Sequence, residues 1–122
     1  SICCVAPGIK GQSENITIRR IVDRYLEHAR VFMFYNNGDP EFYMGSADWM
    51  SRNLFSRIEV IFPVYDKKLR KEINDILQLQ LKDTQKAVFF RADLSNEKIP
   101  ADGDKAIASQ EAIYNYVKGL AG

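Results

Sequence analysis

A turn at Asn36-Asn37-Gly38-Asp39-Pro40 separates two short runs rich in aromatic and apolar residues, and it constrains the fold more than any other segment. Asn, Gly and Asp accept the backbone conformations of a tight reversal, and proline cannot continue a hydrogen-bonded ladder. The runs Arg30–Tyr35 and Glu41–Met44 are therefore predicted to be the paired arms of a hairpin. Because facing residues are counted from the turn, the hairpin also predicts which side chains beyond its arms come together.

The rest of the chain alternates apolar runs with helical patterns. We expect a buried strand at Ile2–Ala6, a loop at Gly8–Asn15, and at Ile16–Ile21 either a half-buried strand or the lead into a short helix through Leu26. The later elements expected from apolar spacing and capping residues are a helix at Trp49–Leu54 capped from Gly45–Asp48, a buried strand at Ile58–Phe62, a helix from its cap Asp66 to about Lys82, a strand at Ala87–Arg91, a loop at Leu94–Ala108 and a last helix capped by Ser109. This mixture predicts an α/β (α+β) fold in a single domain over residues 1–122.

Composition argues against several classes of protein. With a net charge of +1 and 46% apolar residues, the chain lacks the basic field of a nucleic-acid-binding or membrane-surface domain. We find no signal peptide and no apolar stretch of about 18 residues that could span a bilayer. The two cysteines, Cys3 and Cys4, are adjacent and cannot build a disulfide framework, which favours a reducing compartment such as the cytoplasm.

The first residues of the chain predict that it is part of a longer protein. The sequence has no initiator Met, and it opens directly on the expected buried strand Ile2–Ala6. A chain rarely begins inside its own core strand, so we expect that a preceding part of the parent protein is missing.

His28 is the only histidine, and a lone histidine is more often structural than functional. Its surroundings favour a site. Residues two apart in a strand share a side, so His28 and Arg30 are expected to point the same way. About as many residues lead from His28 to the turn as lead back to Gly45, so the hairpin is expected to bring Ser46 and Asp48 near His28. For Asp48, a plain helix N-cap is an equally open interpretation.

Such a cluster combines groups that suit phosphoryl transfer. Imidazole can shuttle a proton or act as a nucleophile. The guanidinium of Arg30 offers a planar fork for phosphate oxygens, and the amides after Gly45 could bind an anion at a helix start. The same set is poor for a metal ion, because there is one histidine and the cysteines are far away in the sequence.

The pattern His28-x-Arg30, a hairpin, and then Gly45-Ser46-Ala47-Asp48 resembles the phospholipase D signature, His-x-Lys followed by Gly-Ser-x-Asn. Arg30 replaces the Lys and Asp48 replaces the Asn. The acidic residue that normally follows the first element is not evident either, because Tyr35 or Asn36 occupies its place. These departures point to a specialised branch of that superfamily, with a phospholipase-D-like mixed sheet flanked by helices.

The wider sequence resembles the last domain of the polyphosphate kinase family over essentially its whole length. The segments that carry this resemblance are Ser13-Glu14-Asn15-Ile16, Ile21-Val22-Asp23-Arg24-Tyr25-Leu26-Glu27-His28, Asn37-Gly38-Asp39-Pro40, Ser46-Ala47-Asp48-Trp49-Met50-x-Arg52-Asn53-Leu54, Arg57-Ile58-Glu59-Val60 and Ala112-Ile113-Tyr114-Asn115-Tyr116.

The resemblance implies reversible transfer of the terminal phosphoryl group of ATP to polyphosphate, through a phosphohistidine in a preceding domain that is absent here. It implies that His28 is the opposing catalytic histidine and that Arg30, Ser46, Asp48 and Asn53 contact nucleotide or phosphate. It further implies Mg²⁺ bound with the nucleotide, ATP or ADP and polyphosphate as partners, a homo-oligomer, and a location in the cytoplasm or peripheral to the inner membrane. Glu59 is expected to have a scaffold role, paired with Arg52 or Arg57.

Two other functions stay open on the sequence. One is half of a phospholipase-D-like phosphodiesterase, such as a nuclease or phosphatidyltransferase, which shares the fold and the histidine; the departures at Arg30 and Asp48 and the near-neutral charge count against it. The other is a non-catalytic module that binds nucleotide or polyanions, because a half-site without its nucleophile should show no turnover.

Overall fold

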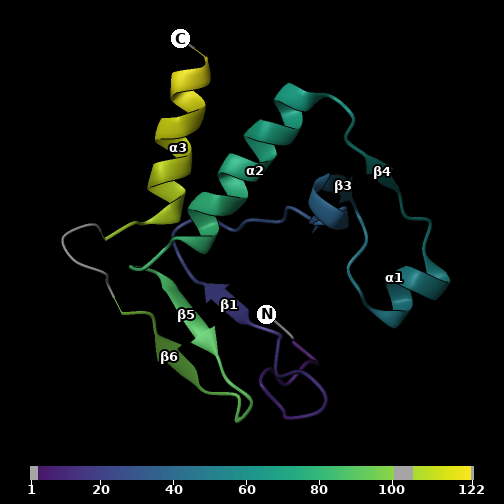
Figure 1. Cartoon of the computed structure of the whole chain (residues 1–122), viewed down its shortest axis with the longest axis vertical. Coiled ribbons are helices and arrows are strands. Elements are labelled where there is room, and N and C mark those ends of the chain that lie inside the picture. Colours follow the sequence, from purple (N-terminus) through teal and green to yellow (C-terminus); the bar gives the residue numbers. More distant parts are fainter. Residues whose placement is uncertain (1–2, 101–105, 122) are drawn as a thin grey trace. The chain divides into compact units, whose positions relative to one another are not determined.

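The structure is a computed structural model that describes residues 3–100 and 106–121 (Figure 1). The chain divides into two compact units, of which the first joins Ser1–Tyr25 to Ile76–Gly122 and the second is Leu26–Asp75. The described strands form two three-stranded antiparallel sheets, one in each unit. The prediction of an α+β fold is confirmed, with two antiparallel sheets in place of one mixed sheet. That the chain is a single domain stays a prediction.

The second unit is built on the predicted hairpin. β2 (Val31–Phe34) pairs antiparallel with β3 (Glu41–Gly45), and Phe34 faces Glu41 next to the turn. The turn contains the short 3-10 helix η1 (Asn36–Gly38), in which all three residues have positive φ. Asparagine and glycine tolerate this left-handed backbone, so the local chemistry closes the hairpin as predicted.

The helix after the hairpin begins later than predicted. α1 (Ser51–Ser56) follows Met50, which precedes the helix without a capping hydrogen bond from its side chain. The interpretation of Asp48 as the helix cap is wrong, because the Asp48 carboxylate is bound by the guanidinium of Arg30. An ion pair made across the sheet thus takes the place of a local cap.

β4 (Ile61–Pro63) is an outer strand that pairs with β3. The predicted buried strand at Ile58–Phe62 is wrong in both length and burial: Ile58 is fully exposed, and the side chains of Ile61 and Phe62 are about half exposed. A continuous apolar run is typical of a strand covered on both faces. Within this unit, an edge strand of three residues has too few neighbours to bury such a run.

α2 (Lys67–Leu81) confirms the predicted long helix and its cap. The Oδ1 atom of Asp66 accepts a hydrogen bond from the backbone N–H of Leu69 at 2.9 Å, which satisfies one of the free donors of the first turn. The boundary between the two units falls inside this helix.

The sheet of the first unit has the strand order β1-β5-β6, formed by β1 (Ile18–Ile21), β5 (Ala87–Phe90) and β6 (Asn96–Lys98). The strand interpretation of Ile16–Ile21 is thereby confirmed, as is the strand at Ala87–Arg91. The expected loop at Leu94–Ala108 contains β6 instead, and its residues 101–105 lie outside the described part of the chain. β6 consists of exposed polar residues, which carry no apolar signal of a strand.

The last helix, α3 (Ser109–Leu120), is present, but Ser109 is its first residue and not its cap. The fully buried carboxylate of Asp83 caps the helix instead, by accepting a hydrogen bond from the Ser109 backbone N–H at 2.7 Å. Its other oxygen, Oδ1, accepts hydrogen bonds from the backbone N–H groups of Gln85, Lys86 and Ala87, at 3.0, 2.7 and 2.9 Å. One carboxylate therefore fixes both the entry to β5 and the start of α3.

The expected buried strand at Ile2–Ala6 is wrong over its described residues, and Ile2 lies outside them. Cys3 is half-buried while Cys4, Val5 and Ala6 are exposed, and within the described chain no strand pairs with them. The predicted loop that follows is confirmed. It is closed by Ser13, whose buried hydroxyl donates to the Ala6 carbonyl at 2.5 Å.

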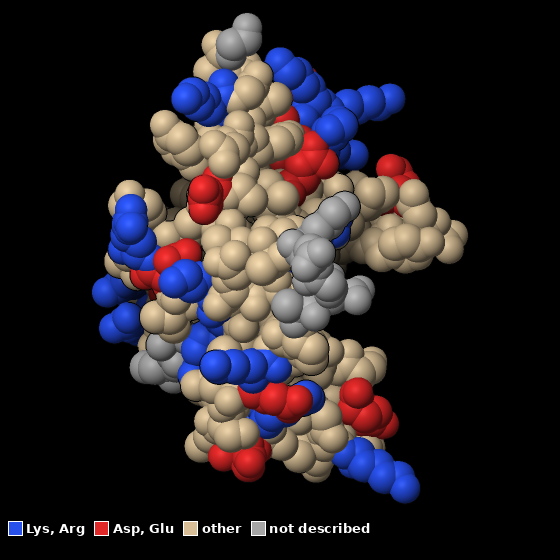
Figure 2. Space-filling model, turned by 90° about the vertical axis from the view of Figure 1, so that its left-hand side faces the viewer, with Lys and Arg blue, Asp and Glu red and all other residues tan. Residues whose placement is uncertain are grey.

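Lys and Arg side chains are interspersed with Asp and Glu over the face of the molecule that Figure 2 displays. This mixing agrees with the net charge of +1. Among the described helices, none has both the length and the hydropathy needed to cross a membrane.

Candidate functional site

The candidate site lies in the second unit, where the hairpin arms end. Arg30 precedes β2, and its carbonyl accepts a hydrogen bond from the Gly45 N–H at 3.1 Å, so the pairing of the two arms continues past the strand. This pairing sets the residues after Gly45 beside Arg30, as predicted from the count of residues around the turn. His28 lies in the loop before β2, and its residue is exposed to solvent.

Three of the predicted residues form one contact chain. The Arg30 guanidinium donates from Nε to Asp48 Oδ1 at 2.8 Å and from Nη2 to His28 Nε2 at 2.7 Å. Its Nη1 atom donates to the His28 carbonyl at 3.3 Å. The Arg30 side chain is 19% exposed and that of Asp48 is 41% exposed, so the pair is open to a ligand.

The contact with Arg30 defines the state of the His28 ring. A guanidinium carries only donors, so Nε2 of His28 must accept this hydrogen bond and cannot bear a proton in this arrangement. A neutral ring then has its proton on Nδ1. Both terminal nitrogens of Arg30 keep a second N–H that these contacts do not use.

The ion pair shifts both of its partners toward the charged form. The hydrogen bond from Arg30 lowers the pKa of the Asp48 carboxyl against the opposing effect of desolvation. In return, the hydrogen bond to Asp48 raises the pKa of Arg30, and the charge of Glu59 adds to this shift. The site therefore holds an ion pair that stays charged at neutral pH.

The two other predicted residues, Ser46 and Asn53, meet at Glu59 and not at His28. The Ser46 hydroxyl donates to Glu59 Oε2 and accepts from the Val60 N–H at 3.1 Å. The Asn53 amide donates to Glu59 Oε1 at 2.7 Å. Both hydrogen bonds lower the pKa of Glu59, and the one from Ser46 has the larger effect.

The expectation that Glu59 pairs with Arg52 or Arg57 is met only in part. A hydroxyl and an amide make the hydrogen bonds to its carboxylate and lower its pKa most, and the charge of Arg57 adds to this effect. Glu59 reaches the site because the chain turns back after α1 and places it beside Ser46. No spacing rule in the sequence predicts that return.

Asn53 is 4% exposed, and its side-chain Oδ1 is buried without a hydrogen-bond partner among the described residues. Because Nδ2 is committed to Glu59, the amide cannot be turned to satisfy this oxygen at no cost. Buried polar atoms are normally paired, so this oxygen calls for a donor from a water or a ligand.

The site does not fit a metal ion held by the protein alone. Over the described residues, no group of three or more His, Cys, Asp or Glu side chains is placed to bind one. The carboxylates at the site are engaged with protein groups: Oδ1 of Asp48 binds Arg30, and the two oxygens of Glu59 bind Ser46 and Asn53. A divalent cation at this site would therefore have to arrive with a ligand.

The arrangement can bind and polarise an anion. It offers an imidazole, a guanidinium with free N–H groups and a carboxylate that orients the guanidinium, all at a partly open surface. Charge-assisted hydrogen bonds of this kind suit planar or tetrahedral oxyanions such as phosphate. The roles assigned to His28, Arg30, Ser46, Asp48 and Asn53 stay predictions.

Known proteins similar to this chain are consistent with that chemistry. A family model described as polyphosphate kinase C-terminal domain 2 matches residues 1–110. Polyphosphate kinases of Vibrio parahaemolyticus and Escherichia coli K12 are 48% and 44% identical to this chain over 119 residues, covering 98% of it. The crystal structure of polyphosphate kinase from Porphyromonas gingivalis matches 98% of this chain with a TM-score of 0.92 and 47% identity.

The chain spans only part of these proteins. It covers 17% of the length of the two curated relatives and 18% of the crystallised chain. The match nevertheless extends over nearly all of the present sequence and includes every residue of the candidate site. The chain belongs to the polyphosphate kinase C-terminal domain 2 family.

Proposed function

We propose that this chain supplies one side of the phosphoryl-transfer site of a polyphosphate kinase. The enzyme would move the terminal phosphoryl group of ATP reversibly onto polyphosphate, through a phosphohistidine that lies elsewhere in the longer protein. The observation that carries the proposal is the contact chain from His28 through Arg30 to Asp48, with distances of 2.7 and 2.8 Å. Preorganised donors of this kind stabilise charge that develops on a transferring phosphoryl group.

The contacts suggest how the site would respond to its substrate. Asp48 keeps the Arg30 fork oriented, and the free N–H groups of Arg30 would hold phosphate oxygens. A phosphate oxygen that also competes for Nη2 would release His28 Nε2 from Arg30. Once released, Nε2 could take up a proton from water. As the other histidine forms its bond to phosphorus and the bond from phosphorus to the bridging oxygen breaks, His28 would then donate a hydrogen bond or that proton to the leaving oxygen.

Ser46, Asn53 and Glu59 would support this centre. Glu59 acts electrostatically on Arg30, and the hydroxyl and amide that hold Glu59 keep its charge in place. The unpaired Asn53 oxygen is a candidate contact for a bound water or ligand donor. Mg²⁺ would enter on the nucleotide's phosphates, since the site's own carboxylates are engaged with protein groups.

The same proposal includes the partners expected of the family. These are ATP or ADP, polyphosphate, the preceding domains of the longer protein and further copies of it in a homo-oligomer. We place the enzyme in the cytoplasm or at the periphery of the inner membrane.

The test is His28→Ala in the full-length enzyme that carries this sequence. Because the ring is exposed, its loss should leave the unfolding midpoint nearly unchanged, while polyphosphate synthesis should fall about 100-fold or more. Lys67→Ala, at an exposed residue of the same unit, is the matched control and should retain synthesis. Near-normal synthesis by His28→Ala would make the histidine structural and contradict the proposal.

The phosphodiesterase alternative is separated by substrate. The full-length enzyme should transfer phosphate from ATP and leave DNA and phospholipid intact in parallel assays. Cleavage of either phosphodiester at a rate comparable with ATP turnover would favour the alternative over a polyphosphate kinase.

A further inference from the structure

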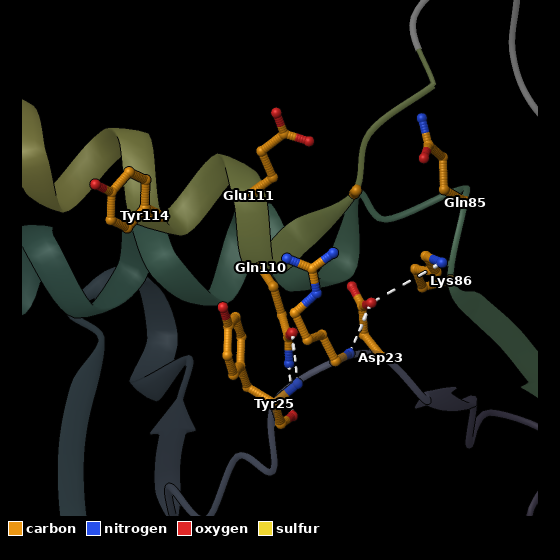
Figure 3. A pocket seen from close by; sticks show the side chains of 9 residues that line it. Asp23, Tyr25, Gln85, Lys86, Gln110, Glu111 and Tyr114 are labelled. Carbon is orange, nitrogen blue, oxygen red and sulfur yellow. Dashed lines mark hydrogen bonds and ion pairs between the residues drawn. The ribbon is translucent and has the colours of Figure 1, made fainter.

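A pocket of about 570 Å³ lies entirely within the first unit, and none of its lining residues belongs to the candidate transfer site (Figure 3). Its walls are the residues that follow β1, the residues that precede β5 and the first turns of α3. The volume is in the range of roughly 300–1,000 Å³ that is usual for sites that bind small molecules.

The walls of this pocket are fixed before any ligand enters. The side-chain amide of Gln110 donates to the Tyr25 carbonyl at 2.7 Å and accepts from the Tyr25 N–H at 3.0 Å, which ties α3 to the segment after β1. Asp83 holds the backbone N–H groups of Lys86 and Ser109 at 2.7 Å each, which ties α3 to the entry of β5. A preformed pocket loses less entropy on binding.

The pocket is lined by two basic residues, Arg24 and Lys86, and two acidic ones, Asp23 and Glu111. Within the described chain, the guanidinium of Arg24 makes no hydrogen bond or ion pair, although its backbone N–H donates to Asp23 Oδ1 at 2.8 Å. The same Asp23 oxygen lies 3.9 Å from the Lys86 ammonium, so these two charges partly cancel. The guanidinium fork of Arg24 and the ammonium of Lys86, which line the same pocket, suit a phosphate group.

The other features of the lining suit a planar base. The residues Tyr25 and Tyr114 are 66% and 65% exposed, and Figure 3 places them toward the end of the pocket away from Gln85 and Lys86. Aromatic rings of this kind stack on nucleobases. Glu111 would repel a phosphate but can accept a hydrogen bond from an exocyclic amino group such as that of adenine.

We propose that this pocket is a second nucleotide site, which binds a nucleoside diphosphate whose base carries an exocyclic amino group. Its phosphates bind Arg24 and Lys86, its base packs against Tyr25 and Tyr114, and Glu111 accepts from the amino group. This site is additional to the proposed transfer site and does not depend on it, because the two share no residue.

The experiment is a titration of the 122-residue chain, labelled with ¹⁵N, with ADP. Amide resonances of residues 23–25, 85–86 and 108–114 should shift together to saturation. Arg24→Gln should weaken binding at these residues about tenfold. Lys118→Gln removes a positive charge from α3 outside the pocket and should bind as before, and so should His28→Ala, which alters only the transfer site.

Further ligands distinguish a nucleotide site from a simple anion site. Inorganic pyrophosphate, adenosine and inosine diphosphate should each bind these residues about tenfold more weakly than ADP, and Tyr25→Leu should reduce the preference of ADP over pyrophosphate. Pyrophosphate or inosine diphosphate binding as tightly as ADP would overturn the assignment of the base. Shifts confined to residues 26–75, no shifts at all, or an unchanged affinity of Arg24→Gln would overturn the site itself.

Discussion

At the scale of single residues, the carboxylates of Asp48 and Asp83 differ in exposure to solvent, yet the pKa of each is lowered. Asp48 is partly exposed and keeps its charge through one guanidinium. Asp83 is 0% exposed, and burial alone would raise its pKa, but the backbone N–H groups of Ser109, Lys86 and Ala87 outweigh this effect and lower it. Hydrogen bonds to the charged form thus decide the state of a buried acid.

Replacing Asp83 should cost the chain much of its stability. In Asp83→Asn, one of the two side-chain atoms becomes a donor and faces backbone donors, so we expect a loss of about 2–3 kcal/mol in the free energy of unfolding. Asp93→Asn is the matched control, because Asp93 is exposed and its hydrogen bonds, to Ser95 and to its own backbone N–H, stay within one turn. Urea unfolding of the two variants measures the difference, and equal losses would contradict the role of Asp83.

The lowered pKa of Asp83 predicts that the stability of the chain depends on pH. The pKa of Asp83 is lower in the folded chain than the value of about 3.9 usual for an unfolded one, so the unfolded chain takes up the proton first as the pH falls. Its contribution is therefore present above about pH 4 and is lost below it. Asp83→Asn should lose less stability than the unaltered chain between about pH 5 and pH 3, and parallel curves would count against this account.

At the scale of elements, the pairing of β3 with β4 depends on one glycine. A Cβ atom added to Gly45 would lie 2.8 Å from the Val60 carbonyl oxygen and 2.8 Å from Ile61 Cγ1. Contacts that short require backbone to move. At Gly45, β3 therefore lies too close to β4 for any residue with a side chain.

Gly45→Ala should separate β4 from β3 and destabilise the second unit by about 1–3 kcal/mol, the usual cost of overpacking. It should also weaken the hold on Glu59, since Ser46 and Val60 flank the site of the clash. Gly119→Ala is the control, because a Cβ there meets nothing within 4 Å and alanine favours a helix. Urea midpoints that fall equally for both substitutions would show that the close approach is not limiting.

At the scale of the whole molecule, the chain by itself should be inactive. It has one histidine, and a reaction through a phosphohistidine with an opposing histidine needs a second. Incubated with ATP labelled in its terminal phosphate, the chain should form no polyphosphate and no acid-labile phosphohistidine, whereas the full-length enzyme should do both. Label found on His28 of the isolated chain would reverse the roles assigned to the two histidines.

Several features follow from the sequence because their causes act over a few residues. Asn36 to Gly38 close the hairpin through their own backbone preferences, and Asp66 caps α2 from three residues away. The hairpin in turn carries the meeting of His28, Arg30 and Asp48, since pairing counted from a turn holds for several residues beyond it. The family resemblance rested on motifs that keep their order along the chain, and the family model matches residues 1–110.

Other features were decided only by the tertiary structure. Asp48 could cap a helix or bind Arg30, and the ion pair prevails because the sheet brings the guanidinium within reach. Nothing in the sequence pairs Asp83 with Ser109, since the two are 26 residues apart, although the contacts of Asp83 with Gln85, Lys86 and Ala87 are local. Glu59 likewise takes its partners from the return of the chain after α1. Sequence patterns carry local preferences and spacing, whereas the choice among distant partners is made by the packing that brings them together.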